Sequence, residues 1–289
     1  METRRRLPDF LKTKLALSDD FNNRKIRNIL KRYNLNTVCN EARCPNKAKC
    51  YGEGVATFLI MGKVCSRNCR FCNIDKGKPE TLDPNEAKNI SEAVKELNLN
   101  YCVLTSVTRD DLEDGGAQCF YDAVYEIRKI NTKTKIEILT PDFQKNEASL
   151  KTIIEANPEV FNHNIETVPR LYKIARNMAD YKRSLEVLAY IKNNSKIITK
   201  TGIMVGLGET REEIEQTFFD VKNADCDILT IGQYIQPSKK HLMVEKYYSP
   251  KEFDALRELA LKIGIKEVIS TPLARSSYMA YESYLKIKG

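Results

Sequence analysis

Apolar, β-branched stretches alternate along the chain with amphipathic stretches, and this alternation predicts the secondary structure. Six short apolar runs have the composition of buried strands, and they cover residues 57–62, 101–107, 135–140, 159–165, 197–206 and 227–234. Between them, apolar residues recur at the i, i+3, i+4 spacing of one helix face. The clearest sets are Ile90, Ala93, Val94 and Leu97; Phe120, Val124 and Ile127; and Ile214, Phe218 and Val221.

Capping residues predict where two of the helices begin and end. Thr210 and Glu213 have the spacing of a capping box, in which each residue bonds the backbone of the other. Ser249 followed by Pro250 predicts the start of a later helix, because proline is favoured at the first helical position. Gly264 predicts its end, since glycine readily takes the left-handed conformation found there.

The strict alternation of strands and helices predicts the class of fold. Six βα units in about 180 residues imply parallel strands joined by right-handed crossovers. Six units are too few for the closed eight-stranded barrel, so we expect an α/β fold built as an open, partial (β/α)6 barrel. An open doubly wound sheet is the alternative. A barrel over residues 51–235 leaves an N-terminal extension, 1–50, and a C-terminal extension, 236–289.

Polar segments follow every predicted strand. Chemistry gathers at the carboxyl ends of parallel strands in both candidate folds, so these segments predict the position of a functional site. They are residues 65–72, 106–111, 140–142, 162–166, 206–209 and 233–237. Taken singly, Asp110, Asp111 and Glu209 are better explained as ordinary loop and capping residues.

Two pairs of residues in or near these strand ends are candidates for binding a ligand. Asn164 and Glu166 are two apart on a strand end and point to one face, where paired acceptors could hold a ribose diol. Gly202 and Gly206 flank an apolar tripeptide, and glycine within a strand often marks the close approach of a ligand. His163, in contrast, is interpreted as a hydrogen-bonded core residue.

Composition and charge exclude several classes of protein. The chain has 289 residues, of which 30% are charged and 42% hydrophobic, so neither disorder nor a collagen-like protein is expected. No apolar run approaches the roughly 18 residues that span a bilayer. Residues 1–6 include four charged side chains and have no apolar segment behind them, so we expect no secretory signal and a thiol-reducing, cytoplasmic location.

Basic residues are concentrated at the start of the chain. Residues 1–35 hold ten Lys and Arg against four Asp and Glu, which accounts for +6 of the net charge of +8. Such a segment is either a solvated arm or a surface that attracts an acidic partner. A nucleic-acid partner is not expected, because no nucleic-acid-binding motif accompanies the charge.

Cysteine spacing carries the strongest chemical signal. Six of the nine cysteines lie within 34 residues as two triplets, CX4CX5C and CX3CX2C, formed by Cys39, Cys44 and Cys50, and by Cys65, Cys69 and Cys72. Disulfides are disfavoured in a long chain with no secretory signal, and structural zinc needs a fourth ligand that neither triplet readily supplies. Three thiolates around an iron–sulfur cubane leave one iron open to another ligand. The other cysteines, Cys102, Cys119 and Cys226, are interpreted as small buried hydrophobic residues.

The second triplet resembles the signature of the radical S-adenosylmethionine (SAM) superfamily, including an aromatic residue, Phe71, directly before its last cysteine. The wider chain resembles the lipoyl synthase family, and the two triplets together with Arg-Ser-Ser-Tyr near the end are specific to it. Matching segments are residues 6–12, 38–46, 105–112, 115–117, 161–172, 202–210, 227–234 and 275–278. At position 279, where the family commonly has histidine, this chain has Met279, so no role of that histidine can be transferred.

The resemblance implies insertion of two sulfur atoms at C6 and C8 of an octanoyl chain on a lysine of a lipoyl carrier protein. It implies two [4Fe–4S] clusters and SAM as cofactors, with the second triplet on the SAM cluster and the first on an auxiliary, sulfur-donating cluster. By the same resemblance Ser277 is the fourth ligand of the auxiliary cluster, and Arg275 belongs to the catalytic motif. The residues expected to contact SAM are Phe71, Ser106, Asn164, Glu166, Gly202 and Gly206. Without it, Ser276 and Ser277 would be interpreted as caps of a final helix at 278–286.

The implied partners are an octanoylated carrier protein or domain, a flavodoxin or ferredoxin-type reductant, and an iron–sulfur cluster carrier, with no nucleic acid and no membrane. Two alternatives remain open at the level of sequence. A radical SAM enzyme with another substrate, such as a methylthiotransferase or a biotin synthase-like enzyme, should lack the first triplet and Arg-Ser-Ser-Tyr. A non-catalytic iron–sulfur electron carrier should show no SAM-dependent formation of deoxyadenosine.

Overall fold

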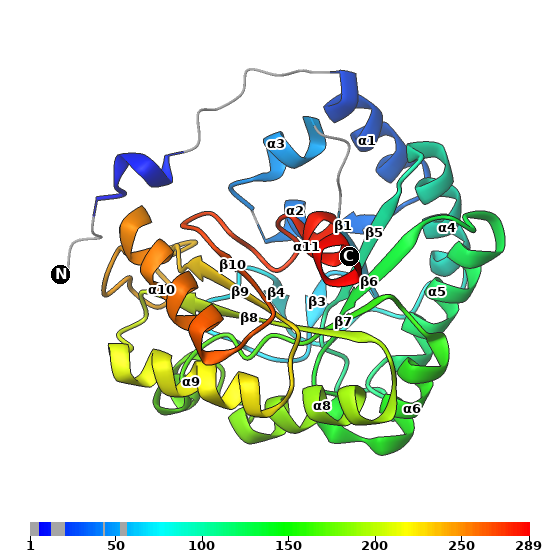
Figure 1. Ribbon diagram of the computed structural model, residues 1–289. Coiled ribbons are helices and arrows are strands. Elements are labelled where there is room, and N and C mark those ends of the chain that lie inside the picture. The colour runs from blue at the N-terminus through cyan, green and yellow to red at the C-terminus, as the bar shows by residue number, and fades with distance from the viewer. Residues whose placement is uncertain (1–5, 13–20, 43, 53–56) are drawn as a thin grey trace. The chain divides into compact units, whose positions relative to one another are not determined.

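The structure is a computed structural model that describes residues 6–12, 21–42, 44–52 and 57–289 (Figure 1). Backbone contacts group the chain into two compact units. We call residues 14–67 and 73–161 the N-terminal unit, and residues 1–13, 68–72 and 162–289 the C-terminal unit. The predicted division near residues 50 and 235 follows motifs rather than contacts and stays a prediction. Arg43, within the first cysteine triplet, and the predicted signal-free start at 1–5 lie outside the described residues.

The N-terminal unit is built on parallel strands. Its part of the main sheet contains β1 (Asn36–Thr37), β2 (Thr57–Ile60), β5 (Tyr101–Ser106) and β6 (Lys135–Leu139), in that order. β2, β5 and β6 run parallel, whereas the two-residue β1 is antiparallel to β2. Two short strands, β3 (Val64–Cys65) and β4 (Asp75–Lys76), form a separate parallel pair.

Three helices of this unit pack beside one another along β5 and β6 (Figure 1). They are α4 (Glu86–Leu97), α5 (Ala117–Ile130) and α6 (Glu147–Ala156), and they are preceded in the chain by α1 (Phe21–Arg32), α2 (Val38–Glu41) and α3 (Lys47–Gly52). The apolar faces predicted for α4 and α5 are confirmed, since Ile90, Val94, Phe120 and Ile127 are each at most 1% exposed. Their burial, worth about 1.5–3 kcal/mol for each side chain, fixes which way the helices face.

β7 (Val160–Asn162) lies where the two units meet in the chain. Glu159, just before it, donates its N–H to the carbonyl of Ile136 in β6, at 2.9 Å. His163, just after it, donates its N–H to the carbonyl of Lys200 in β8, at 3.0 Å. β7 therefore follows β6 in the strand order and precedes β8.

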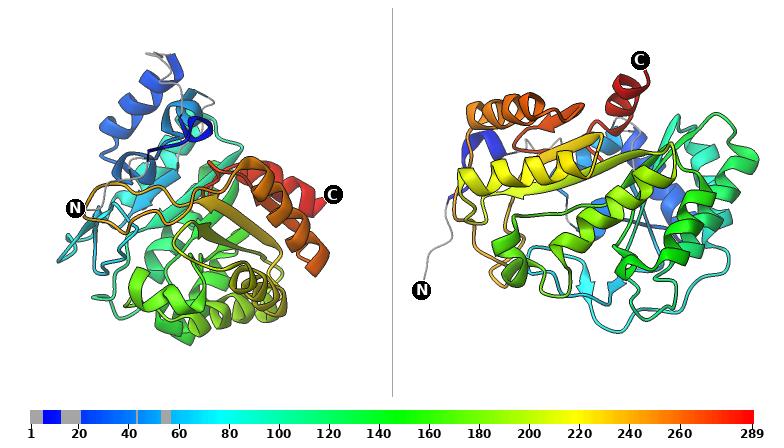
Figure 2. Two further views of the ribbon diagram at one scale, coloured as in Figure 1. Left: turned by 90° about the vertical axis from the view of Figure 1, so that its left-hand side faces the viewer. Right: turned by 60° about the horizontal axis from the view of Figure 1, so that its bottom comes forward.

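The C-terminal unit continues with β8 (Ile198–Val205), β9 (Ile228–Gln233) and β10 (Glu267–Ser270), all parallel. Its helical segments are η1 (Asp9–Leu11), η3 (Pro169–Leu171), α7 (Tyr172–Ala175), α8 (Tyr181–Asn194), α9 (Arg211–Asn223), α10 (Pro250–Ile263) and α11 (Ala280–Lys288). Figure 2 shows α9 and α10, in yellow and orange, side by side along these strands. The capping box predicted at Thr210 forms. A second capping box forms at Ser249, the predicted start of α10, and Gly264 ends that helix at φ +105°.

Strand order in the main sheet distinguishes between the two folds predicted for the chain. The strands follow one another in chain order, β1-β2-β5-β6-β7-β8-β9-β10, without the reversal that defines a doubly wound sheet. β1 and β10 are the edges among the described strands, so the sheet is not closed. The prediction of an open α/β barrel is therefore confirmed, with β1 and β10 in addition to the six predicted strands.

The last helix differs from its prediction. It begins at Ala280 rather than residue 278, and its N-cap is Met279, which has φ +50° and makes no side-chain capping bond. The interpretation of Ser276 and Ser277 as helix caps is therefore wrong. No helix in the described part of the chain is long and apolar enough to cross a membrane.

The cap of α10 gives a test of this local structure. Ser249 Oγ accepts the N–H of Glu252, and Glu252 Oε2 accepts the N–H of Ser249 at 2.8 Å. We expect Ser249→Ala to lower the free energy of unfolding by about 1 kcal/mol, because it leaves an N–H at the helix start without its acceptor. Ser249→Thr, which keeps the hydroxyl, should restore most of that loss in denaturant titrations. Equal loss in both variants would contradict the capping role.

Candidate active site

The turn that leaves β2 introduces the loop of the CX3CX2C motif. Met61 and Gly62 both adopt left-handed backbone conformations, with φ +65° and +88°. Glu86 of α4 accepts the N–H of Met61 at 2.8 Å, and Arg109 donates to the carbonyl of Met61 at 3.4 Å. Burial raises the pKa of Glu86 to about 6, although the two backbone N–H groups of the turn oppose that rise. The turn is therefore held from both sides by charged side chains.

Cys65 has an environment suited to a thiolate ligand. Its Sγ accepts two backbone N–H groups, from Arg67 at 3.4 Å and from Thr108 at 3.3 Å. Its carbonyl accepts the N–H of Gly77 at 3.0 Å, which joins β3 to the segment after β4. Such N–H···S bonds stabilise negative charge on sulfur and are a common feature of iron–sulfur ligands. Cys65 therefore fits a role as an iron ligand.

Two carboxylates from neighbouring strand ends bind Arg67, the residue two after Cys65. Arg67 donates through Nε and Nη2 to both oxygens of Asp110, at 2.7 and 2.8 Å, and through Nη2 to Asp142 at 2.6 Å. Ser66 donates both its backbone N–H and its hydroxyl to the carbonyl of Thr108. The strand-end residues of the N-terminal unit thus hold the cysteine loop in place, a role that the sequence does not reveal.

Cys69 and Cys72 lie in the C-terminal unit, where a turn joins them through the N–H of Cys72 and the carbonyl of Cys69 at 3.2 Å. His241 Nε2 lies 3.1 Å from the carbonyl oxygen of Cys72, and Ser238 Oγ lies 2.9 Å from the other ring nitrogen. Phe71, between the two cysteines, is half-buried. His241 therefore fixes the backbone of the cysteine loop, and nothing in the sequence pointed to that role.

The predicted ribose-binding pair lies together at the end of β7. Asn164 Nδ2 donates to Glu166 Oε1 at 3.1 Å, as expected for side chains on one face. It also donates to Ser276 Oγ of the Arg-Ser-Ser-Tyr segment at 2.5 Å. Burial raises the pKa of Glu166, while Arg176 and Arg275 act in the opposite direction. Four residues thus lie close together. Asn164, Glu166 and Arg275 were selected on separate sequence grounds, and Ser276 is the neighbour of Arg275.

Buried polar side-chain atoms lie beside Gly202, at the centre of β8. A Cβ on Gly202 would lie 2.9 Å from Asn164 Oδ1, so only glycine leaves room for this amide. Asn164 Oδ1 and Thr230 Oγ1 are both buried and have no hydrogen-bond partner among the described residues. Buried polar atoms are normally satisfied, so these two fit a polar ligand beside Gly202 and Thr230, which are paired on β8 and β9. Thr230 was not selected from the sequence.

Gly206 is required for a different reason. It has φ +104°, and a Cβ there would lie 2.2 Å from Gln233 Nε2 and 2.4 Å from the carbonyl oxygen of Lys246. The close approach at Gly206 is therefore made by the protein itself. Glu209 accepts the N–H groups of Gly206 and Leu207, at 2.5 and 2.9 Å, which supports its interpretation as an ordinary loop residue.

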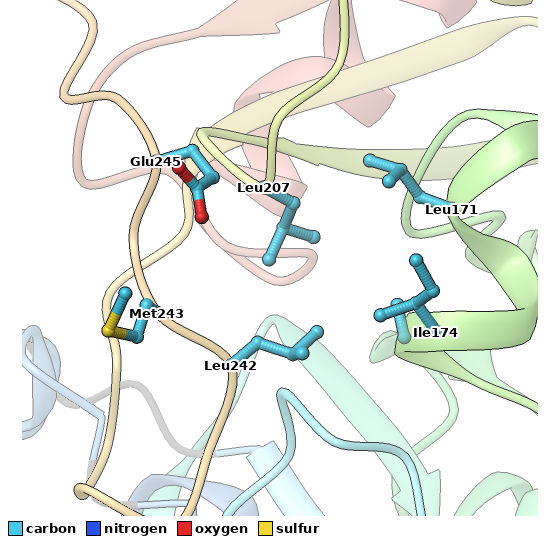
Figure 3. A pocket seen from close by; sticks show the side chains of 7 residues that line it. Leu171, Ile174, Leu207, Leu242, Met243 and Glu245 are labelled. Carbon is cyan, nitrogen blue, oxygen red and sulfur yellow. The ribbon is translucent and has the colours of Figure 1, made fainter. Parts of the chain in front are cut away.

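An apolar pocket of about 170 Å³ lies in the C-terminal unit (Figure 3). Leucine, isoleucine and methionine side chains point into it, with one carboxylate at its rim; the lining residues are Leu171, Ile174, Ala175, Leu207, Leu242, Met243 and Glu245. Arg70, in the cysteine loop, donates its N–H to the carbonyl of Ala175 at 2.8 Å and accepts the N–H of Leu242 at 3.2 Å. The pocket therefore borders the backbone between Cys69 and Cys72.

A buried tyrosine, Tyr51, directly follows the last cysteine of the first triplet in the N-terminal unit. Tyr51 is fully buried and its hydroxyl lies 2.8 Å from Thr37 Oγ1. Burial raises the pKa of Tyr51, the bond to the Thr37 hydroxyl lowers it, and the negative charges of Cys39, Cys44 and Cys50 raise it further. Burial likewise raises the pKa of the Cys39 thiol to about 11, so its thiolate needs a positive partner such as iron.

The remaining candidates have simpler environments. Ser106 Oγ, at the end of β5, is buried without a partner in the described part of the chain, which is compatible with its predicted contact to SAM. His163 is 1% exposed, in keeping with a core position. Cys102 and Cys226 are buried as predicted and Cys119 is half-buried; none of the nine cysteines forms a disulfide. No three histidine, cysteine or carboxylate side chains within the described ranges are already arranged as a metal site.

Comparisons with known proteins agree with this geometry. Residues 59–221 match the model of the radical SAM superfamily, and residues 1–44 match that of the N-terminal domain of lipoyl synthase. The chain is 48% identical over 284 residues to the lipoyl synthase of Caldicellulosiruptor saccharolyticus, covering 98% of each chain. It is 49% identical over 276 residues to that of Caldanaerobacter subterraneus, covering 95% of this chain and 96% of the relative.

The chain belongs to the lipoyl synthase family. As a radical SAM sulfurtransferase of that family it uses a [4Fe–4S] cluster and SAM. Among solved structures, methylornithine synthase has a TM-score of 0.58 at 17% identity, covering 88% of this chain and 83% of its own. HydG, a maturase of the [FeFe]-hydrogenase, has a TM-score of 0.60 at 12% identity, covering 80% of this chain and 54% of its own. These two likenesses confirm the radical SAM fold of this lipoyl synthase.

The raised pKa of Glu86 predicts how stability depends on pH. Its pKa of about 6 in the folded protein exceeds the ordinary value of 4.5, so the folded state binds this proton more tightly than the unfolded chain. Stability from this group is therefore present below pH 4.5 and is lost as pH rises through 6, a change of about 2 kcal/mol. Glu86→Gln should remove that dependence in thermal unfolding scans. Glu92→Gln, an exposed glutamate of the same helix, should keep it, and identical profiles for the two variants would contradict the assignment.

Proposed function

We propose that this lipoyl synthase inserts sulfur at C6 and C8 of an octanoyl chain that is amide-linked to a lysine of a lipoyl carrier protein, and that an auxiliary [4Fe–4S] cluster donates both sulfur atoms. The observation that carries the proposal is the presence of two cysteine triplets, each with three thiols, in a chain that matches the family over nearly its whole length. Three thiolates leave one iron of a cubane open in each case.

The residues that would hold the clusters divide by triplet. Cys65, Cys69 and Cys72 would hold the SAM cluster, and the N–H groups directed at the Cys65 sulfur support that assignment. Cys39, Cys44 and Cys50 would hold the auxiliary cluster, which is supported by their CX4CX5C spacing within one short segment. When bound, the SAM cluster and SAM supply a 5′-deoxyadenosyl radical that abstracts hydrogens too weakly acidic for any side-chain base to remove.

Residues of β9 and of the segment after β7 would bind SAM in the C-terminal unit. Asn164 Oδ1 and Thr230 Oγ1, both buried and available as acceptors, suit the hydroxyl groups of a ribose. Glu166 beside them adds a carboxylate acceptor. The apolar pocket next to the Arg70 backbone suits the flat, largely apolar faces of adenine, and its volume of about 170 Å³ is sufficient for one such ring system. Residues of this pocket were not selected from the sequence.

Ser277 would complete the auxiliary cluster. A serine oxygen is a harder ligand than a thiolate and binds iron of this kind less strongly, so it would release readily when sulfur is withdrawn. Asn164 holds the neighbouring Ser276 by its hydroxyl, which restricts where Ser277 can lie within the C-terminal unit. The guanidinium of Arg275 donates a hydrogen bond to the carbonyl of Ala274 at 2.6 Å. Its positive charge acts to lower the pKa of Glu166, against the larger effect of burial.

Three partners follow from this reaction. An octanoylated carrier protein or domain would present the substrate, a flavodoxin or ferredoxin-type protein would supply electrons, and an iron–sulfur carrier would rebuild the auxiliary cluster. The +6 charge of residues 1–35 favours acidic proteins among these, because positive surfaces attract them over a Debye length of about 8–10 Å. Neither a nucleic acid nor a membrane is needed, and the thiol-rich clusters suit a reducing, cytoplasmic compartment.

Metal content tests the two-cluster proposal. Protein reconstituted without oxygen should bind about eight iron atoms per chain, since each cubane contains four. Iron and zinc would be measured together by plasma emission spectrometry. A value near four iron atoms, or stoichiometric zinc, would contradict the presence of two cubanes.

Single cysteine variants separate the roles of the two triplets. Cys69→Ala should abolish reductive cleavage of SAM, measured as deoxyadenosine, because it removes a ligand of the SAM cluster. Cys44→Ala should retain cleavage but form no lipoyl product from an octanoylated carrier peptide, measured by mass spectrometry. Cys119→Ala, a half-buried thiol outside both triplets, should retain both activities. A Cys44→Ala variant that still inserts sulfur would overturn the donor role of the auxiliary cluster.

A further inference from the structure

Arg67 is buried within the cysteine loop although it ligates nothing. Its side chain is 4% exposed, and the two carboxylates that it binds, Asp110 and Asp142, are 21% and 0% exposed. The bond to Asp110 uses two nitrogens and both carboxylate oxygens, which is the geometry that only a guanidinium fork provides. One guanidinium thus joins the loops that follow β2, β5 and β6.

Stability alone does not account for this cluster of charges. The desolvation of buried ion pairs offsets most of their attraction, and well-packed apolar residues in their place are often equally stable or more stable. A buried network of this kind is instead suited to fixing one arrangement of the backbone. Its members here lie at the carboxyl ends of parallel strands, where the fold places its chemistry.

The backbone after Asp142 is strained. Phe143, Gln144 and Lys145 have φ of +44°, +49° and +60°, three consecutive left-handed conformations in residues that are not glycine. Each such conformation costs of the order of 1–3 kcal/mol and persists only where surrounding interactions impose it. Asp142 supplies such interactions, since Oδ1 accepts both Arg67 and the N–H of Gln144. The loop therefore adopts an unfavourable shape that places this carboxylate on Arg67.

The bonds of Arg67 also fix a hydrogen bond to sulfur. Asp110 lies two residues after Thr108, whose N–H donates to Cys65 Sγ at 3.3 Å. Ser66 Oγ accepts the N–H of Asp110 at 3.1 Å and donates to the carbonyl of Thr108 at 2.9 Å. Holding Asp110 against Arg67 therefore holds the Thr108 N–H against the Cys65 sulfur. All of these residues belong to the N-terminal unit.

We propose that Arg67 is a positioning residue that sets the reduction potential of the SAM cluster, by fixing the Thr108 N–H on the sulfur of Cys65. This inference rests on the proposed ligand role of Cys65. Reduction adds one electron, taken from a low-potential one-electron donor, and so adds negative charge to the cluster and its thiolates. An N–H directed at a ligand sulfur stabilises that charge, so its loss makes reduction harder.

The test is Arg67→Lys, which keeps the positive charge but cannot bind both oxygens of Asp110 together with Asp142. The control is Arg70→Lys, the same substitution at an exposed arginine of the same loop for which no ion pair is found in the described structure. Both are made in full-length protein in which Cys39, Cys44 and Cys50 are alanine, so that only the SAM cluster is observed. The midpoint potential is measured by redox titration followed by electron paramagnetic resonance.

We expect Arg67→Lys to reduce the ratio of reduced to oxidised cluster about tenfold at a given potential, a negative shift of about 59 mV for one electron. Arg70→Lys should leave the potential unchanged. A potential for Arg67→Lys that equals that of Arg70→Lys, or that rises, would overturn the proposal.

Asp110→Glu gives a second measurement if Arg67→Lys fails to fold or to bind four iron atoms. It also preserves charge but displaces the carboxylate by one methylene, and should shift the potential in the same negative direction. An unchanged potential in that variant would overturn the proposal. None of these titrations uses an octanoyl substrate, so failure of the parent enzyme to form lipoyl product would contradict the proposed function and leave this measurement intact.

Discussion

Three thiolates in one short loop repel one another, and the loop can present them to iron only if other bonds fix its backbone. This constraint explains much of the structure around residues 61–72. The N–H groups of Arg67 and Thr108 point at the Cys65 sulfur, where they would offset the charge of a thiolate ligand, and the ring of His241 lies on the carbonyl of Cys72. The supporting groups come from segments far apart in sequence, which the parallel strands bring to the same edge of each unit.

Hydrophobic periodicity and capping chemistry were sufficient to predict the main elements of the barrel. Strands such as β5 and β8 are long enough for their apolar runs to be recognised, and the capping boxes at Thr210 and Ser249 depend only on local bonds. β10 was missed because a four-residue strand beginning with Glu267 has too little pattern. α11 was placed two residues early because its N-cap, Met279, lacks a capping side chain.

The arrangement of the candidate residues was predictable where it depends on spacing in the sequence and unpredictable where it depends on tertiary contacts. Cysteine spacing identified both triplets, and the two-residue separation of Asn164 and Glu166 correctly placed them together. Arg67 could not be paired with Asp142 from the sequence, because 75 residues separate them. Gly206 illustrates the same limit, since its missing side chain makes room for Gln233 and Lys246 rather than for a ligand.

The amide of Asn164 has a consequence for molecular selectivity. Its nitrogen is engaged by Ser276 and Glu166, so the group cannot rotate by half a turn without losing both bonds. Only the carbonyl oxygen of the Asn164 amide faces the space beside Gly202. This oxygen can accept hydrogen bonds but cannot donate them. A molecule with a hydroxyl at that point can satisfy it, whereas an ether or a phosphate oxygen there would meet another acceptor and be repelled. Asn164 would thus favour a ligand with a hydroxyl at this point over one with an ether or phosphate oxygen.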